Sequence, residues 1–225
     1  MADPILNPEI MSFLSSLEKN NNREWFEANK SRYTKAKASF DSFVEELIRM
    51  AKSIDPGIGY LEPKNCTFRI YRDVRFSKEK SPFKTNFGAY ISKGGKNSEY
   101  AGYYFHLEPS ESFIAGGKYM PQGPELKAIR EAIFDEPSKF REILDKPSFK
   151  KHFSGIMGEK LKTAPQGYPK DHPDIDLVNY KGYAVFQPLS QQMLKSPDLL
   201  NEIRSAWTEL KTLNDFLNRA VGARE

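Results

Sequence analysis

The apolar residues of this chain change their spacing along the sequence, and this change limits the fold more than any other feature. Before Asp55 and after Pro197 they recur every three to four residues, as on one side of an amphipathic helix. Between Cys66 and Gly117 they alternate with polar residues, as in strands with one buried face. Helical ends around a middle of strands predict an α+β fold.

The strands follow one another closely, which is typical of an antiparallel meander. The predicted strands are Cys66–Phe76, Phe87–Lys93, Glu99–Glu108, Ser112–Ala115 and a short final strand, Tyr183–Phe186. The loop of residues 94–97 has the glycine content of a hairpin connection. We expect helices to cover the apolar face of this sheet.

Residues that begin and end helices mark the helical segments. Asn7-Pro8 reads as the N-cap and first position of one helix, and Asn21 with Glu24 has capping-box spacing for the next. That second helix is expected to stop at residues 55–57, Asp-Pro-Gly. Later starts are predicted at Pro124, Pro137 and Ser196-Pro197, with irregular structure over 154–181. Without repeats or a linker, we expect a single α+β domain over residues 1–225, with long N- and C-terminal helices.

The composition favours a soluble protein of the cytoplasm. Hydrophobic residues make up 39% of 225 residues, which is ordinary for a globular chain. Neither a signal peptide nor an apolar run of about 18 residues is visible, so no membrane partner is expected. The single cysteine, Cys66, fits a reducing compartment, and its apolar neighbourhood predicts a buried, unreactive thiol rather than a nucleophile.

Charge gives the clearest functional signal. The window Lys64–Lys96 carries nine basic and two acidic residues, a net +7, whereas the whole chain is +4 and the rest is therefore −3. Such a concentration predicts a site for an anion, with arginines as forked donors and lysines as point charges. The candidate ligand-binding residues are Arg69, Arg72, Arg75, Lys78, Lys80 and Lys84.

Arg72 conflicts with the strand pattern. Alternation places Arg69 and Arg75 on the polar face but Arg72 on the apolar face, with Phe68 and Ile70. An unpaired buried guanidinium costs several kcal/mol. Arg72 is therefore either a structural residue, paired with an acid or turned outward by a bulge, or part of a ligand site. The loop lysines likewise either frame an anion or form a solvated edge that deters aggregation.

Other candidates carry weaker signals. His106 shares a strand face with Tyr104, and the two are candidate catalytic residues, although a structural histidine is the simpler interpretation. His172 lies in a Lys-Asp-His-Pro-Asp segment, which lacks a second cluster at metal-ligand spacing, so no metal is predicted. Gly116-Gly117-Lys118 is a poor match to a phosphate loop. No cofactor is predicted.

The same residues carry a family resemblance. The chain resembles the domain of unknown function 2461 family, a conserved hypothetical protein family, over nearly its whole length. The matching segments are residues 21–26, 68–78, 80–84, 103–108 and 116–117, then Ile129-Arg130, Gly158, Leu161-Lys162 and residues 165–168. Glu79 and Phe83 stand where the family tends to have Asp and Tyr. The resemblance implies one intact domain, but no reaction, cofactor or catalytic residue.

Three functions remain open. The leading hypothesis is a small phosphorylated or carboxylated ligand on the sheet face, bound by the basic segment, in a protein that could be an enzyme. The second is nucleic-acid binding, with Tyr71, Phe83 and Phe87 as stacking rings. The third is a non-catalytic interaction domain that uses its long helices. A concave pocket at Arg72 favours the first, and a long basic groove the second. The oligomeric state is not predicted.

Overall fold

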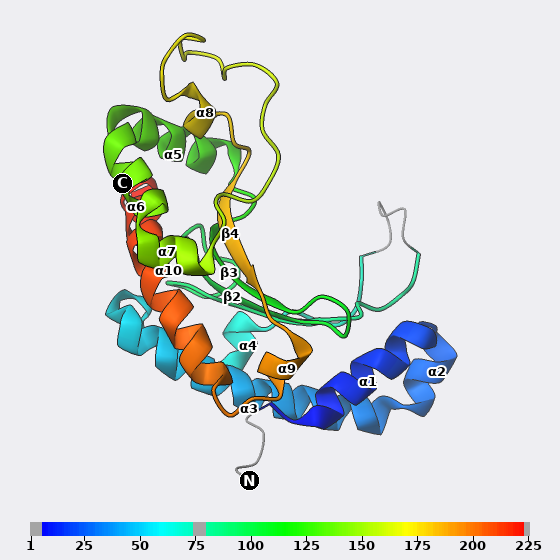
Figure 1. The fold of residues 1–225 in the computed structure, drawn as a ribbon. Helices are drawn as coiled ribbons and strands as arrows, with labels where there is room; N and C mark the ends of the chain where they lie inside the picture. The colour runs from blue at the N-terminus through cyan, green and yellow to red at the C-terminus, as the bar shows by residue number, and fades with distance from the viewer. Residues whose placement is uncertain (1–5, 74–79, 223–225) are drawn as a thin grey trace.

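A four-stranded antiparallel sheet forms the centre of the fold and has helices packed against one face (Figure 1). The computed structural model describes residues 6–73 and 80–222. Within them the strands are β1 (Phe87–Ile91), β2 (Gly102–Leu107), β3 (Phe113–Lys118) and β4 (Tyr183–Pro188), hydrogen-bonded in the order β1-β2-β3-β4. Four of the five predicted strands are thus confirmed within a few residues at their ends, as is the α+β class.

The first predicted strand is wrong over its described part. Cys66 ends a short helix, α4 (Pro63–Cys66), because Pro63 at the first position starts a turn. Beyond it the chain meets the segment before β1 only at two isolated bridges, Thr67↔Ala89 and Tyr71↔Phe83. Three residues lie between the bridges on one side and five on the other, so the pairing is irregular. We call the paired segments 67–72 and 83–89 the irregular ladder. Residues 74–76 lie outside the described residues.

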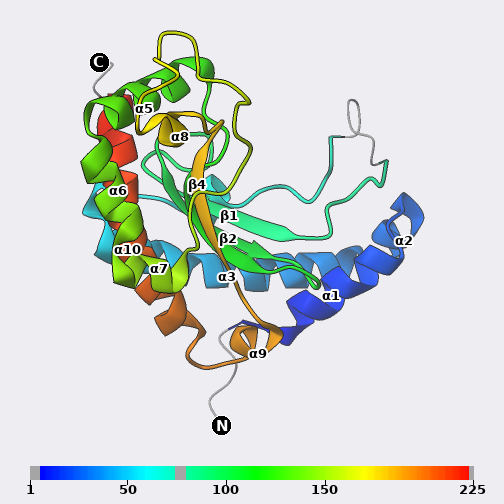
Figure 2. The same cartoon turned by 45° about the horizontal axis from the view of Figure 1, so that its top comes forward.

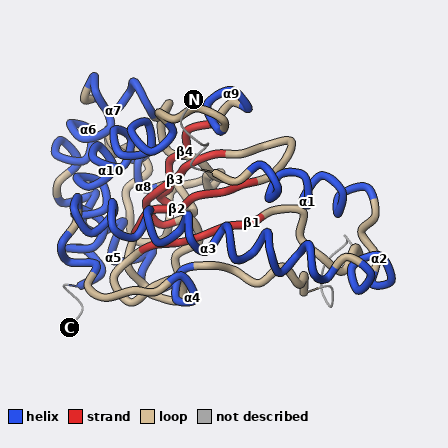
Figure 3. The backbone as a smooth tube through the Cα atoms, turned by 90° about the horizontal axis from the view of Figure 1, so that it is seen from below, coloured by secondary structure: helices blue, strands red, loops and turns tan. Residues whose placement is uncertain are grey.

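Two long helices, α3 (Lys30–Ile54) and α10 (Leu199–Gly222), cover one face of the sheet (Figures 2 and 3). The alternate residues of β2 that face them are fully buried. Phe105 packs its ring 5.0 Å from that of Phe43 on α3, and Tyr103 lies 5.2 Å from Trp207 on α10. The apolar stripes seen in the sequence thus meet the apolar face of the strands, in one continuous hydrophobic core.

The N-terminal pair of helices meets the irregular ladder. In α1 (Pro8–Lys19), Asn7 caps the first turn as predicted, with its side chain accepting from the Glu9 amide. In α2 (Arg23–Ala28) the cap is Asn22, whose side chain accepts from the Trp25 amide at 2.8 Å, so the predicted capping box at Asn21 is wrong by one residue. Asn21 instead bonds the backbone of Phe83 twice, donating to its carbonyl at 2.9 Å and accepting from its amide at 3.1 Å.

Two of the remaining helices, α5 (Gly123–Asp135) and α6 (Pro137–Asp145), begin within one residue of the predicted starts. The shorter elements η1 (Pro56–Ile58), α7 (Pro147–His152), α8 (Ile175–Val178) and α9 (Gln191–Leu194) were not predicted. Residues 154–181 are irregular apart from α8, as expected from their composition. Over the part of the chain that the structure describes, no helix is both long enough and apolar enough to cross a membrane.

Candidate functional site

The sheet face opposite α3 and α10 is the candidate location for a ligand site, because the helices of the described chain leave it uncovered. In Figures 1 and 2 no helix of the described chain lies across this face, which we call the open face. Residues 154–181 stand beside one end and the segments 67–73 and 80–86 beside the other. Strand register places five rings on this face, and each is half-buried. They are Tyr90, Tyr104, His106, Phe113 and Phe186.

A chain of hydrogen bonds runs through the open face along β2 and just beyond its end. Tyr104 Oη lies 2.9 Å from His106 Nδ1, and His106 Nε2 lies 3.1 Å from Glu108 Oε2. Thr85 donates to the other carboxylate oxygen of Glu108. Because an ionised carboxylate only accepts, Nε2 carries the imidazole proton and Nδ1 accepts from the tyrosine hydroxyl. We call this the Tyr104–His106–Glu108 chain.

Burial sets the protonation states of this chain. Burial lowers the pKa of His106 below its ordinary value, and the hydrogen bond and charge of Glu108 offset part of that effect. Burial also raises the pKa of Tyr104 to about 12. At neutral pH the imidazole is therefore neutral and the phenol protonated, which is the arrangement that the hydrogen bonds require.

Gly88 makes room for this chain. It lies opposite His106 in the β1–β2 register, and a Cβ atom at this position would stand 2.6 Å from Tyr104 Oη. The hydroxyl therefore occupies the space that any other side chain would need. Sequence reasoning selected Tyr104 and His106 but neither Gly88, Thr85 nor Glu108. The shared strand face of His106 and Glu108 was the signal available for the last.

Three of the predicted cations, Lys84, Arg69 and Arg72, lie near one another beside the Tyr104–His106–Glu108 chain. Lys84 Nζ lies 5.6 Å from the centre of the Phe68 ring, and that ring is 6.3 Å from the ring of Tyr104. Burial lowers the pKa of Lys84, and the charges of Arg69 and Arg72 lower it further. Among the described residues no carboxylate forms an ion pair with any of these three cations, which we call the cation cluster.

Arg72 occupies the edge between the irregular ladder and α2. Its side chain is half-buried; Nη2 lies 3.5 Å from the Phe83 carbonyl, a weak contact, and within the described residues its buried Nε has no hydrogen-bond partner. The predicted apolar face is only partly formed: Cys66 and Ile70 are buried in the core, whereas Phe68 meets Tyr104 instead. A hollow of about 260 Å³ opens at this place, lined by Arg23, Glu27, Tyr71, Arg72, Pro82 and Phe83.

The cation cluster does not include the remaining predicted cations, and His152, which was not a candidate, has a structural role. Lys80 is exposed, whereas Arg75 and Lys78 lie outside the described residues. His152 is buried between Gln187 and Ser205, at 3.0 Å from each, and ties α7 to β4 and α10. In the described chain no group of three or more His, Cys, Asp or Glu residues could hold a metal ion.

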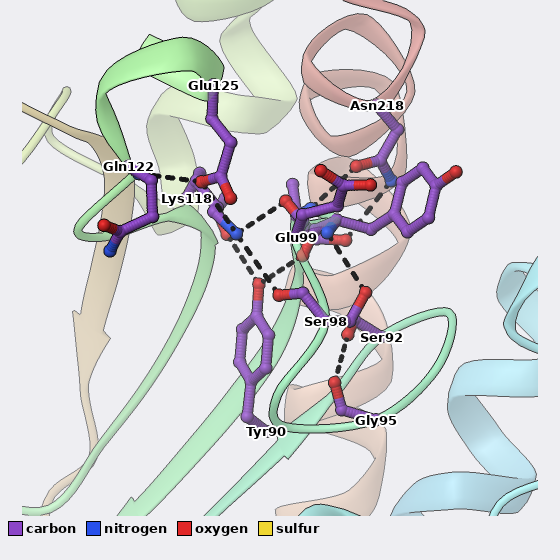
Figure 4. A network of polar contacts seen from close by, with 12 residues as sticks. Tyr90, Ser92, Gly95, Ser98, Glu99, Lys118, Gln122, Glu125 and Asn218 are labelled. Atoms are coloured by element: carbon purple, nitrogen blue, oxygen red, sulfur yellow. Dashed lines mark hydrogen bonds and ion pairs between the residues drawn. The ribbon is translucent and has the colours of Figure 1, made fainter. Parts of the chain in front are cut away.

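The glycine pair before Lys118 is structural. Gly116 and Gly117 lie within β3, and a Cβ atom at Gly117 would stand 2.2 Å from the Tyr183 carbonyl oxygen. Lys118 Nζ is bonded to the Ser98 and Glu99 carbonyls and lies 3.3 Å from the buried Glu125 carboxylate (Figure 4). These contacts hold the β1–β2 connection to α5. Lys118 therefore has a structural role, and the segment does not have the structure of a phosphate loop.

Comparison with known proteins identifies a family but no function. The sequence matches the model of a family described as a conserved hypothetical protein (DUF2461), over residues 9–216. No curated protein and no solved structure matches the chain.

Proposed function

This chain belongs to the conserved hypothetical family DUF2461, and we propose that it binds a small phosphorylated or carboxylated ligand where the cation cluster meets the open face. The observation that carries the proposal is that Lys84 is half-buried over the Phe68 ring, and that no carboxylate of the described residues forms an ion pair with any member of the cation cluster. The pKa of Lys84 is lowered by burial and by Arg69 and Arg72, so three positive charges are held together at an electrostatic cost. A bound anion would remove that repulsion and would raise the pKa of Lys84.

The surroundings suggest how the ligand is held. Arg72 offers a buried Nε with no partner among the described residues, and a guanidinium binds carboxylate or phosphate through two parallel hydrogen bonds. The hollow beside it, about 260 Å³, is smaller than the usual ligand pocket of roughly 300–1,000 Å³, so it admits one small group rather than a whole cofactor. Its lining carries two arginines, Arg23 and Arg72, against one carboxylate, Glu27. Arg75, Lys78 and Lys80 remain proposed contributors from the sequence.

The Tyr104–His106–Glu108 chain gives the same site a proton acceptor. Neutral His106 can take the hydroxyl proton of Tyr104, and Glu108 would stabilise the imidazolium that forms. The tyrosine oxygen could then accept a proton from a ligand bound nearby. Tyr104 and His106 are accordingly our candidates if the protein proves to be an enzyme.

Nucleic-acid binding is the weaker alternative. Of the three rings proposed as stacking platforms, Phe83 and Phe87 are each 2% exposed, and Phe83 stacks on Phe26 with ring centres 3.9 Å apart. Only Tyr71 is open to solvent. Base stacking needs exposed ring faces, so we retain the small ligand.

A thermal-unfolding screen tests the proposal. Wild type, Arg72→Ala and Lys84→Met are melted with inorganic phosphate and with phosphorylated and carboxylated metabolites, at constant ionic strength. A ligand at a hundred times its dissociation constant stabilises the folded protein by about 2.7 kcal/mol. We expect saturable stabilisation of wild type and of Lys127→Met, a control at an exposed lysine on α5, with loss in both site variants. Equal responses from wild type and the site variants would refute the proposal.

A further inference from the structure

We infer that the open face binds a flat aromatic or heteroaromatic ring, so that the ligand is an aryl or heteroaryl phosphate or carboxylate. This inference rests on the proposed function, because it supplies the part of the ligand that lies beyond the anion. It is drawn from a set of side chains that the cation cluster does not include: Tyr104, His106, Phe113 and Phe186. We call these four residues the ring floor.

The rings of the floor pack against one another, and His106 and Phe113 each cover one face of the other. His106 stacks on Phe113 with ring centres 4.5 Å apart and planes 10° from parallel. Tyr104 lies 5.8 Å from Phe113, and Phe186 meets Phe113 edge to face at 6.1 Å. Three adjacent strands thus contribute to one continuous aromatic surface, on which a planar ring can make edge-to-face and offset contacts.

The ring floor is incompletely covered, unlike the opposite face of the same strands. Tyr103 and Phe105, which alternate with Tyr104 and His106 along β2, are each 0% exposed under α3 and α10. The four floor residues are all half-buried, and no helix of the described chain lies across the sheet face to which they belong (Figure 1). Apolar area left in water is unfavourable in proportion to its size, so a ring that covers this surface gains binding energy.

The floor and the cation cluster adjoin, which points to an anionic ring rather than to a neutral one. Phe68 links them, because Lys84 lies over its ring and its edge meets Tyr104. The two distances, 5.6 and 6.3 Å, place Lys84 Nζ within about 12 Å of the Tyr104 ring. A phosphate or carboxylate joined to a ring by a short link can therefore reach the cations while the ring lies on the floor.

The polar groups of the floor favour an apolar ring over a polar one, because they are already hydrogen-bonded. The hydroxyl of Tyr104 and both nitrogens of His106 are engaged within the Tyr104–His106–Glu108 chain. Asn86 contacts His106 Nδ1 only at 3.5 Å, too long for a strong hydrogen bond, and its amide is the group at the margin of the floor that could bond a ring substituent.

Calorimetric titration with matched probes tests the inference. The probes are inorganic phosphate, phenyl phosphate, cyclohexyl phosphate and a nucleoside monophosphate, applied to wild type, Lys84→Met, Phe113→Leu and Phe134→Leu. Cyclohexyl phosphate matches the size of the phenyl compound without its flat ring. Phe134 is a half-buried ring on α5 that contacts Tyr168 and His172 instead of the floor, which makes it the control for losing an aromatic side chain.

We expect phenyl phosphate to bind wild type and Phe134→Leu about tenfold more tightly than either non-aromatic probe, as edge-to-face or offset contacts between aromatic rings allow. In Phe113→Leu this preference should disappear while inorganic phosphate still binds. If Phe113→Leu fails to fold, magnetisation transfer from the His106 and Phe113 ring protons to phenyl phosphate is measured in wild type, where its presence is expected.

The contrary results are distinct. Lys84-dependent binding of inorganic phosphate without a phenyl preference, or without ring-to-ring transfer, overturns this inference and leaves the proposed function standing. Acetate and benzoate, titrated in the same way, test the carboxylate form, and no binding of any of these phosphates or carboxylates overturns both. A short single-stranded oligonucleotide that binds more than tenfold tighter than the monophosphate, with steep salt dependence, overturns the small ligand in favour of nucleic acid.

Discussion

Replacement of Gly88 by alanine is the sharpest test of how the open face is built. The added Cβ would stand 2.6 Å from Tyr104 Oη and 3.2 Å from two carbons of its ring. Tyr104 and the new methyl group must separate by about 0.4 Å merely to reach 3.0 Å, the limit that real contacts respect. Because the Tyr104 ring lies between Phe68 and Phe113, this movement would disturb its 2.9 Å hydrogen bond to His106.

The expected cost follows from these two effects. Overpacking of a filled site typically costs about 1–3 kcal/mol, and the lost hydrogen bond about 0.5–1.5 kcal/mol. We therefore expect Gly88→Ala to lower the free energy of unfolding by about 2–4 kcal/mol. Gly123→Ala is the matched control, since a Cβ there meets nothing within 4 Å. It should be neutral or stabilising by up to about 1 kcal/mol.

Urea denaturation of a double-mutant cycle with Tyr104→Phe isolates the cause. Phenylalanine removes the hydroxyl, and with it the 2.6 Å contact, but keeps the ring. Gly88→Ala should therefore cost at least about 0.5 kcal/mol less in the Tyr104→Phe background than in wild type, within the range of coupling found for touching residues. Equal costs in the two backgrounds would show that the hydroxyl does not fill this space.

Three further predictions concern single titrating groups. The pKa of His106, followed by NMR, should lie below 6.5 and fall further in Glu108→Gln. The free energy of unfolding should then decrease as the pH drops from 6.5 toward the pKa of the folded state. A titration midpoint of His106 above 6.5 would contradict this prediction. The pKa of Lys84, followed by NMR of its Nζ group, should rise toward 10.5 in Arg69→Gln. An unchanged pKa would show that the charge of Arg69 does not act on Lys84. Cys66, buried and with a pKa of about 11, should react with iodoacetamide only at the rate of unfolding, so that rapid labelling of the folded protein would disprove its burial.

Local signals were sufficient for most of the secondary structure. Proline and asparagine before an apolar stripe located α1, α5 and α6, because these residues satisfy or omit the backbone donors that a helix start leaves unpaired. Alternation located the four strands of the sheet. The short helices α4, α7 and α9 were missed because four to six residues carry too little periodicity to be recognised.

Asn21 illustrates a different limit. Its spacing to Glu24 suits a capping box, yet Asn22 takes the cap and Asn21 pairs with the backbone of Phe83, 62 residues away. Nothing local distinguishes two adjacent asparagines. The choice is made by the tertiary partner, which a single sequence does not reveal.

The sequence indicated the charged residues of the candidate site, but not how they are arranged in space. The irregular ladder explains both results. Continued regularly from Thr67↔Ala89, the pairing would set Tyr71 opposite Thr85; the bridge instead joins Tyr71 to Phe83. A shift of two residues does not change which side chains share a face. The sequence therefore shows the alternation of a strand, although the two segments are not paired regularly. The two displaced residues are those that reach the open face: Thr85 bonds Glu108, and Asn86 approaches His106. The departure from a regular strand is therefore what brings the basic segment beside the Tyr104–His106–Glu108 chain, where we propose the site.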